Sequence, residues 1–150
     1  MARVRELGHL VLYVRDLERS RHFYRDVLGW PEVTVVAGIG VAFSAGRTHH
    51  ELLLIEVGPQ AAPIPAGRRV GLYHFGLNIG ESDDDLRRAR DELLAAGAEI
   101  VGTADHTVTH SLYVRDPDGN EIELYVDALP SEVWTAHPEL LASPIRPLAL

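Results

Sequence analysis

The chain has 150 residues, of which 46% are hydrophobic and 24% charged, a composition typical of one soluble globular domain. A formal net charge of −8 argues against nucleic-acid binding, because neutralising phosphates requires clustered lysine and arginine. The absence of cysteine excludes disulfides and thiolate chemistry, so any metal ion must be held by histidine and carboxylate. No apolar run approaches the ~20 residues of a membrane helix, and the first residues show no signal-peptide core. We therefore expect a cytoplasmic protein with no membrane partner.

The first half of the chain predicts a strand, a helix and three more strands. Residues 7–14 are nearly all apolar and predict the first strand, after which Asp16 can cap a helix. The apolar stripe of this helix would consist of Leu17, Tyr24, Val27 and Leu28. Short β-prone runs follow at 32–37, 40–44 and 51–57.

The second half predicts the same order of elements. Residues 72–79 predict a strand, and Ser82 can cap a helix that opens with three aspartates, where the helix dipole favours negative charge. The buried stripe of this helix would consist of Leu86, Ala89, Leu93 and Leu94. Strands are expected at 99–101, 111–115 and 121–126, the last two joined by the turn sequence DPDGN.

The two halves also resemble each other directly. The segment GHLVLYVRDLERSRHFYRDVLG at 8–29 is echoed by YHFGLNIGESDDDLRRARDELLAAG at 73–97, with His9 and His74 in the second place of each copy. This duplication predicts an α+β fold in which two tandem βαβββ modules form one curled mixed-sheet domain, 1–150, around a shared cavity. The expected parts are module one at about 5–58, a linker at 59–70, module two at about 71–127 and a C-terminal tail at 128–150.

Strand alternation predicts which side chains face that cavity. In YHFGLNI, the apolar set of Tyr73, Phe75, Leu77 and Ile79 would pack under the helix, so His74, Gly76 and Asn78 would face the cavity. Glu123 stands between Ile122 and Leu124 on a strand expected to be largely buried. A buried carboxylate needs a partner, and beside two cavity histidines a divalent cation is the natural one.

These features together resemble the vicinal oxygen chelate superfamily, which includes glyoxalase I, extradiol catechol dioxygenases and bleomycin-sequestering proteins. The resemblance rests on the duplicated modules, the histidine that opens each module and the ending DPDGNEIELY, and it covers roughly residues 5–127. It implies three metal ligands, His9, His74 and Glu123. Glyoxalase-type members add a fourth ligand on the last strand of module one, where this chain has Leu53, or Glu51 if the register shifts. A set of two histidines and one carboxylate with open positions is that of non-haem Fe(II) oxygenases, and Mn(II) is an alternative metal.

Three further positions resemble extradiol dioxygenases in particular. HHELLL supplies His50, HTVTHSLY supplies His106, and Tyr113 lies ten residues before Glu123. The resemblance implies that His106 and Tyr113 transfer the proton of a substrate hydroxyl and stabilise the charge on its oxygen. It implies that His50 supplies a proton as a general acid. His49 remains an alternative to His50, because strand alternation places it with Glu51, and His110 remains an alternative to His106.

The resemblance therefore implies an Fe(II)-dependent extradiol dioxygenase of aromatic catabolism that opens a catechol ring with O2. The rival interpretations are a metal-dependent isomerase or lyase of the glyoxalase type, a protein that sequesters a small molecule, and a small domain with a vestigial site. No role is assigned to His22 or His137. The apolar residues of the tail are expected to pack on the domain or on a second subunit, and we expect a homodimer.

Overall fold

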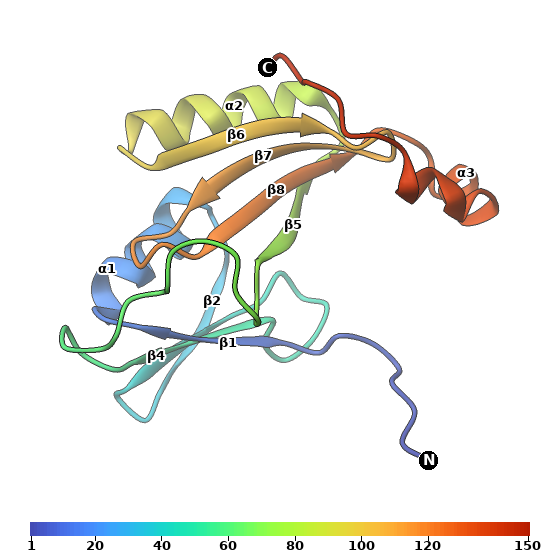
Figure 1. Ribbon diagram of the computed structural model, residues 1–150. Coiled ribbons are helices and arrows are strands. Elements are labelled where there is room, and N and C mark those ends of the chain that lie inside the picture. The colour runs from blue at the N-terminus through green and yellow to red at the C-terminus, as the bar shows by residue number, and fades with distance from the viewer. The chain divides into compact units, whose positions relative to one another are not determined.

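The computed structural model describes residues 1–150, which divide into two compact units, Met1–Ile64 and Pro65–Leu150. The division falls inside the segment expected to link the two modules. Each unit contains one four-stranded sheet with helices (Figure 1). The two units are described separately below.

The first unit follows the predicted order of one strand, a helical segment and three strands. The helical segment begins as an α-helix and continues as a single π-helical turn. The elements are β1 (Leu10–Val14), α1 (Leu17–His22), η1 (Phe23–Val27), β2 (Glu32–Val36), β3 (Gly40–Phe43) and β4 (Leu52–Glu56).

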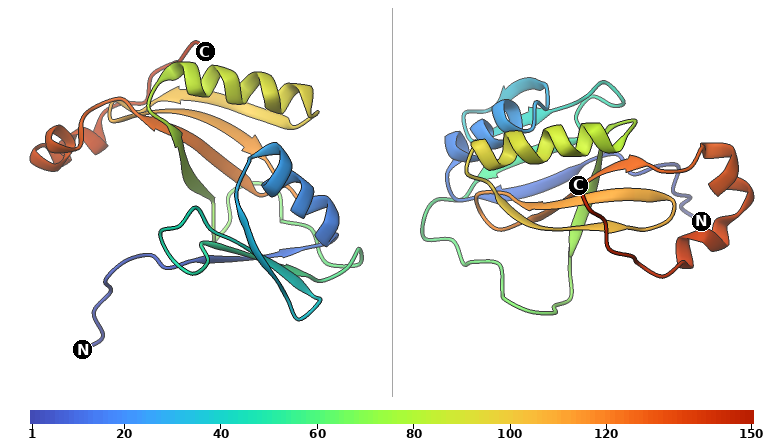
Figure 2. Two further views of the ribbon diagram at one scale, coloured as in Figure 1. Left: turned by 180° about the vertical axis from the view of Figure 1, so that it is seen from behind. Right: turned by 90° about the horizontal axis from the view of Figure 1, so that it is seen from above.

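The second unit repeats this order and adds a helical tail. Its elements are β5 (His74–Gly80), α2 (Asp83–Ala95), β6 (Glu99–Asp105), β7 (Thr109–Arg115), β8 (Glu121–Asp127), α3 (Ser131–Ala136) and η2 (Pro138–Ala142). Strand β6 is longer than the predicted 99–101, because small and polar residues as far as Asp105 still pair with β7. Figure 2 shows α2 lying along one face of this sheet.

The two sheets have the same topology. Their strand orders are β1-β4-β3-β2 and β5-β8-β7-β6, and in each sheet the first pair is parallel while the others are antiparallel. The register matches as well. The second residue after His9 pairs with Leu53, as the second residue after His74 pairs with Glu123. The α+β class and the two tandem βαβββ modules are thereby confirmed, and Leu53 is the structural counterpart of Glu123.

Helix α1 begins where the sequence predicts it. The Asp16 side chain accepts a hydrogen bond from the Arg19 backbone nitrogen at 2.9 Å and so caps the helix. The predicted buried stripe is only partly right: Tyr24 is fully buried, but Phe23 beside it is also buried. The π-helical turn widens the helix at this point, which lets two successive aromatic side chains face the core.

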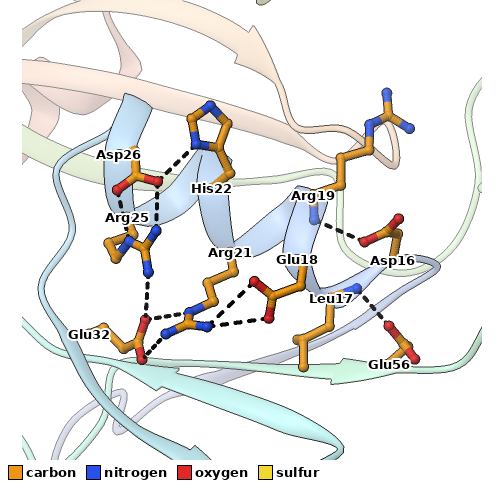
Figure 3. A network of polar contacts seen from close by, with 10 residues as sticks. All are labelled: Asp16, Leu17, Glu18, Arg19, Arg21, His22, Arg25, Asp26, Glu32 and Glu56. Atoms are coloured by element: carbon orange, nitrogen blue, oxygen red, sulfur yellow. Dashed lines mark hydrogen bonds and ion pairs between the residues drawn. The ribbon is translucent and has the colours of Figure 1, made fainter.

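Ion pairs on the outer side of α1 connect the helix to the sheet (Figure 3). The Arg21 guanidinium donates to both carboxylate oxygens of Glu32, the first residue of β2, at 2.7 and 2.8 Å. Glu18 approaches Arg21 at 3.3 Å, while His22 contacts Asp26 at 2.8 Å. His22 therefore takes part in a partly exposed network on the helix surface.

In the second unit, the helix-facing side of the sheet forms the core. Ile122, Leu124 and Val126 of β8 are buried on this side, and Phe75 of β5 is buried with them. Leu86 and Leu93 of α2 are buried as predicted, but Leu94 is 57% exposed. Leu94 lies one residue beyond the stripe, about 100° further around the helix. Tyr73 was also expected to be buried and is 70% exposed, because β5 begins only at His74.

The C-terminal tail packs against the edge strand of the second sheet. Asp105 and Arg146 exchange two backbone hydrogen bonds of 2.9 Å, and the Arg146 guanidinium also donates to the Asp105 carboxylate. Thr103 donates to the Leu148 carbonyl at 2.7 Å. The residues after α3 therefore cover part of the β6 edge, which limits pairing with another chain there. None of the helices is both long and apolar enough to cross a membrane.

Candidate functional site

The face of the second sheet opposite α2 carries most of the predicted site residues. Along β8, Ile122 and Leu124 are buried toward the helix, whereas Glu121, Glu123 and Tyr125 alternate onto the other face. On β5, His74 shares this face with Gly76 and Asn78, as the strand pattern predicts, since Phe75 is buried on the helix side. The sheet thus separates an apolar core from a polar, partly open surface.

Glu123 is the centre of this polar surface. Its Oε1 atom accepts hydrogen bonds from Ser111 Oγ at 2.6 Å and from the Tyr113 hydroxyl at 3.1 Å. Its Oε2 atom lies 3.2 Å from His74 Nε2. Because the Ser111 and Tyr113 hydroxyls hold Oε1, Oε2 is directed at the His74 imidazole. The Glu123 side chain is only 17% exposed.

Tyr113 connects Glu123 to a second histidine. The Tyr113 hydroxyl is 2.7 Å from His106 Nε2, and that nitrogen is 3.7 Å from Glu123 Oε1. Burial, followed by the negative charge of Glu123, raises the pKa of Tyr113 above its ordinary value. The phenol therefore keeps its proton near neutral pH, and it can donate that proton either to the carboxylate or to the imidazole.

The structure separates the two histidines that the sequence left as alternatives in this region. His106 contacts Tyr113. His110 instead contacts Asp83 at the start of α2, with Nδ1 2.6 Å from Oδ1, and lies 3.8 Å from Asp105. Strand alternation explains the difference, because His110 is on the same side of β7 as the buried Leu112. Of the two, only His106 is placed to act together with Glu123.

The remaining predicted histidines lie together in the first unit. The ring centroids of His9 and His50 are 4.3 Å apart, and those of His49 and His50 are 4.5 Å apart. His49 lies farther from His9, with a centroid separation of 6.4 Å. Burial, followed by repulsion from the other two imidazoles, lowers the pKa of His50. His50 is therefore mainly neutral at neutral pH, and of the two alternatives it is the one closer to His9.

The resemblance noted from the sequence implies a fourth ligand for glyoxalase-type proteins on the last strand of module one, where leucine has no atom that binds a metal. Leu53 occupies that position in the register of β1 and β4. The alternative, Glu51, is already engaged, because its Oε2 accepts from the Ala45 backbone nitrogen at 2.7 Å and its Oε1 lies 3.3 Å from Arg47 Nε. The Arg47 guanidinium in turn donates to the Leu7 and Gly8 carbonyls, which ties the segment before His9 to this loop.

The donor atoms of His74 and Glu123 suit a divalent cation. Two ligand atoms that bind one ion at about 2.1 Å in neighbouring positions stand roughly 3 Å apart, close to the 3.2 Å between Nε2 and Oε2. Within either unit, no group of three or more histidine and carboxylate side chains is arranged to hold a metal ion. His9 belongs to the first unit and the other two ligands to the second, so the complete three-residue set stays a prediction.

Ser111 is a site residue that the sequence interpretation missed. It is fully buried and donates the shortest hydrogen bond to Glu123. The signal was its spacing, because Ser111 is two residues from Tyr113 and so shares its face of the strand. Serine is common in strands, so the sequence alone does not single out Ser111. Only the pairing of β7 with β8 shows that Ser111 contacts Glu123.

The chain is similar to a known protein family. The Glyoxalase/Bleomycin resistance protein/Dioxygenase superfamily matches residues 6–124. The chain is 35% identical over 128 residues to a catechol-2,3-dioxygenase of Bacillus subtilis, covering 85% of this chain and 43% of the relative. It is 34% identical over 134 residues to biphenyl-2,3-diol 1,2-dioxygenase 3 of Rhodococcus globerulus, covering 84% of this chain and 66% of the relative. The chain thus spans about half to two thirds of the length of these two relatives.

A solved structure agrees with the sequence comparison. The lactoylglutathione lyase of Agrobacterium tumefaciens superposes with a TM-score of 0.63 at 27% identity, covering 88% of this chain and 98% of that one. The repeated topology, the histidine that opens each module and the match over residues 6–124 lead to one conclusion. The chain belongs to the Glyoxalase/Bleomycin resistance protein/Dioxygenase superfamily.

Proposed function

We propose that this chain is a metal-dependent extradiol dioxygenase that opens the ring of a catechol-type aromatic with O2. The contact chain Glu123–Tyr113–His106 is the observation that carries this proposal, because it would join the proposed carboxylate ligand to two groups able to pass a proton. The relatives named catechol and biphenyl-diol dioxygenases support the same reaction class.

His9, His74 and Glu123 would hold the metal ion, which we propose to be Fe(II), with Mn(II) as the alternative. When bound, the ion would supply a template for both reactants and a path for electrons between them. In support, the carboxylate of Glu123 is held by Ser111 and Tyr113 so that one oxygen remains for the ion. A set of two histidines and one carboxylate would leave positions for the catechol and for O2.

Tyr113 and His106 would remove the proton of the substrate hydroxyl and stabilise the charge left on its oxygen. Since its pKa is raised, Tyr113 stays protonated. When substrate binds, its single O–H would turn from Glu123 to the hydroxyl oxygen as that oxygen gains charge, and Ser111 would continue to hold Glu123. His106, 2.7 Å from the Tyr113 hydroxyl, would take the released proton, because an imidazole nitrogen can accept a proton and later release it. The phenol would end the transfer protonated, as it began.

His50 would supply a proton later, as oxygen adds to the ring. Its lowered pKa makes its protonated form a stronger acid than an ordinary imidazolium and favours proton donation to oxygen. It would first have to gain a proton, since the neutral form predominates at neutral pH. That proton would come from the solvent, because the proton removed from the substrate would be held by His106.

A metal-dependent isomerase or lyase of the glyoxalase type is the second candidate, supported by the likeness to the lactoylglutathione lyase. Against it stands Leu53 at the position of the fourth ligand. We expect a cytoplasmic homodimer in either case.

The deciding experiment is to load the protein with Fe(II) anaerobically and then screen catechols for oxygen uptake and for the yellow ring-fission product. The Glu123→Gln variant serves as the control that lacks the carboxylate. Ring fission that depends on Fe(II) and Glu123 is the expected result. If no catechol consumes oxygen, while protein purified in air retains Ni(II) or Zn(II), the isomerase candidate would replace the dioxygenase.

A further inference from the structure

The loop that carries His106 is a short connection between β6 and β7. Asp105 ends β6 and pairs with His110 across the hairpin. The His106 backbone nitrogen donates to the Thr109 carbonyl at 2.9 Å, which closes the turn. Because the loop is this short, the direction of the His106 side chain depends on the backbone conformation of the residues beside it.

The backbone next to His106 has an unfavourable conformation. Thr107 has a φ angle of 73°, in the left-handed region that residues branched at Cβ rarely adopt. Such a conformation persists only where neighbouring groups hold it. Here the Asp105 side chain accepts a hydrogen bond from the Thr107 backbone nitrogen at 2.7 Å, and it is only 17% exposed. The Asp105 carboxylate thus holds the turn that presents His106.

Arg146 of the C-terminal tail fixes that carboxylate. Its Nε donates to Asp105 Oδ2 at 3.0 Å, and its Nη2 donates to Oδ1 at 3.2 Å. The backbones of the same two residues exchange two hydrogen bonds of 2.9 Å. Pro147 favours this pairing, because a residue before proline prefers extended backbone. Side-chain and backbone hydrogen bonds therefore both join one tail residue to the residue before His106.

The histidine on the other side of Asp105 does not hold its carboxylate in this way. His110 Nε2 lies 3.8 Å from Asp105 Oδ1, beyond hydrogen-bond range, while His110 Nδ1 is 2.6 Å from Asp83. Hydrogen bonds from Arg146, followed by that from the Thr107 backbone, lower the pKa of Asp105. The carboxylate is therefore charged at neutral pH, with Arg146 and Thr107 as its main partners.

The loop places His106 against Tyr113. His106 Nε2 is 2.7 Å from the Tyr113 hydroxyl, and the two ring centroids are 6.3 Å apart. Hydrogen bonds weaken beyond about 3.2 Å, so a small shift of the loop would break this one. A misplacement of about 1 Å can slow a reaction by as much as about 100-fold. The conformation of the loop therefore decides whether the two side chains can exchange a proton.

We propose that Asp105 and Arg146 are positioning residues for His106. Asp105 holds Thr107 in its left-handed conformation, and Arg146 holds the Asp105 carboxylate and the backbone beside it. The tail would thereby set the place of a proton-transfer group through β6 and the loop. The effect on turnover rests on the proposed function, whereas the effect on the contact between His106 and Tyr113 does not.

The first test is the contact between His106 and Tyr113 in the metal-free protein. Nuclear Overhauser effects between the two rings measure it, with signals assigned through His106→Gln and Tyr113→Phe variants. These effects should weaken in Arg146→Leu and in Asp105→Ala, because the loop is then free to move. The matched control is Arg115→Leu, the same change at the other end of β7, which should retain them.

Hydrogen exchange at the Thr107 amide tests the intermediate step. Asp105→Ala removes the acceptor and should speed exchange by about 10-fold, and Arg146→Leu should speed it by about threefold. Asp105→Asn keeps an acceptor oxygen and should exchange more slowly than Asp105→Ala. Asp84→Ala, the same change at an exposed aspartate of α2, should leave the exchange rate unchanged.

Kinetics on Fe(II)-loaded protein measure the consequence for the reaction. Arg146→Leu should lower kcat on a catechol by about 10-fold, with KM and Fe(II) affinity within about threefold of wild type, because it acts on proton transfer and not on binding. Adding Arg146→Leu to His106→Gln should cause no further loss, since the group that Arg146 positions is then absent. Arg115→Leu should leave kcat unchanged in both backgrounds.

Unchanged ring contacts and Thr107 exchange in Arg146→Leu would overturn the inference, and so would an equal loss of kcat with and without His106. The Arg146 side chain is 60% exposed, so Arg146→Leu should fold and decides the question even if Asp105→Ala does not fold. If wild type opens no catechol, the proposed function fails, and the two measurements on metal-free protein alone decide the role of Asp105 and Arg146.

Discussion

Tyr113 and Glu123 lie directly opposite each other on β7 and β8, and the Tyr113 hydroxyl donates to Glu123 Oε1 at 3.1 Å. In an antiparallel pair, residues ten positions apart meet in this way only if the connecting turn has the matching length. Here the turn contains Asp116, whose carboxylate accepts from the backbone nitrogens of Asp118 and Asn120. The DPDGN sequence therefore sets the register that brings the phenol to the carboxylate.

Replacing Tyr113 by phenylalanine should slow turnover and leave the fold intact. The change removes the hydrogen bond to Glu123 and the contact with His106, and we expect about a 100-fold loss in kcat on a catechol. The ring-fission absorbance of Fe(II)-loaded protein measures it. Tyr125→Phe removes a hydroxyl from the same face of β8 and should retain wild-type turnover. A Tyr113→Phe variant as fast as wild type would contradict the proposed proton transfer between the substrate, Tyr113 and His106.

His106 and His110 should respond differently to glutamine. His106→Gln removes the group that exchanges protons with Tyr113, so kcat should fall by about 100-fold. His110→Gln should keep its turnover, because His110 contacts Asp83 on the helix side of the sheet. Losing that contact should lower Tm by about 2–4 °C, the effect of roughly 1 kcal/mol in a chain of this size. If only His110→Gln lost turnover, His110 and not His106 would be the histidine that exchanges protons in the reaction.

Replacing His50 by alanine should affect the reaction with oxygen more than the binding of substrate. We expect kcat/KM for O2 to fall by about 100-fold, with KM for the catechol changed by less than about threefold. His49→Ala is the matched comparison, since His49 adjoins His50 but lies farther from His9. Oxygen-electrode kinetics at several O2 concentrations measure both constants. Should His49→Ala show the loss and His50→Ala not, the roles would be exchanged.

Placing a carboxylate at position 53 tests the repeat symmetry of the site. Leu53 is the counterpart of Glu123, so Leu53→Glu would offer a fourth ligand at the position that the resemblance implies for glyoxalase-type proteins. We expect tighter Fe(II) binding and slower ring fission, because a position needed by a reactant would be filled. Leu53→Gln, similar in size and uncharged, controls for the loss of the leucine. Unchanged metal affinity in Leu53→Glu would show that position 53 is not at the metal.

The contact between the tail and the sheet should depend on pH. Hydrogen bonds from Arg146, followed by that from the Thr107 backbone, lower the pKa of Asp105. A carboxyl whose pKa is lowered on folding stabilises the fold above its unfolded value of about 3.9, and this contribution is lost as pH falls through the folded pKa. Arg146→Leu should therefore lower Tm at pH 6 and differ less from wild type below about pH 4.

Thermal melts by circular dichroism between pH 7 and pH 3 measure this effect. The Tm of Arg115→Leu, which loses an ion pair with Glu99 on the same sheet, is compared with the Tm of Arg146→Leu at each pH. A difference in Tm between Arg146→Leu and wild type that stays the same at every pH would show that Asp105 does not act through its charge.

Local patterns in the sequence predicted most of the secondary structure. The cap at Asp16, the strand that carries His74 and the buried pair Leu86 and Leu93 all follow from nearest-neighbour chemistry and periodicity. The errors at Phe23 and Leu94 arose where the helix departs from ideal geometry or where an apolar residue stands just outside the stripe. Such departures depend on packing, and no local pattern encodes them.

By itself, the sequence determined the duplication, the α+β class and the residue types available for a site: imidazoles and carboxylates, but no thiols. The tertiary structure decided which of these residues meet. It put His106 rather than His110 beside Tyr113, brought Ser111 to Glu123 and placed Glu121 near the buried nitrogen of His74. Two of these contacts cross between strands and the third joins the β6–β7 loop to β7, and the physical reason is register. A shift of one residue turns a side chain to the opposite face of the sheet, and long-range pairing fixes that register.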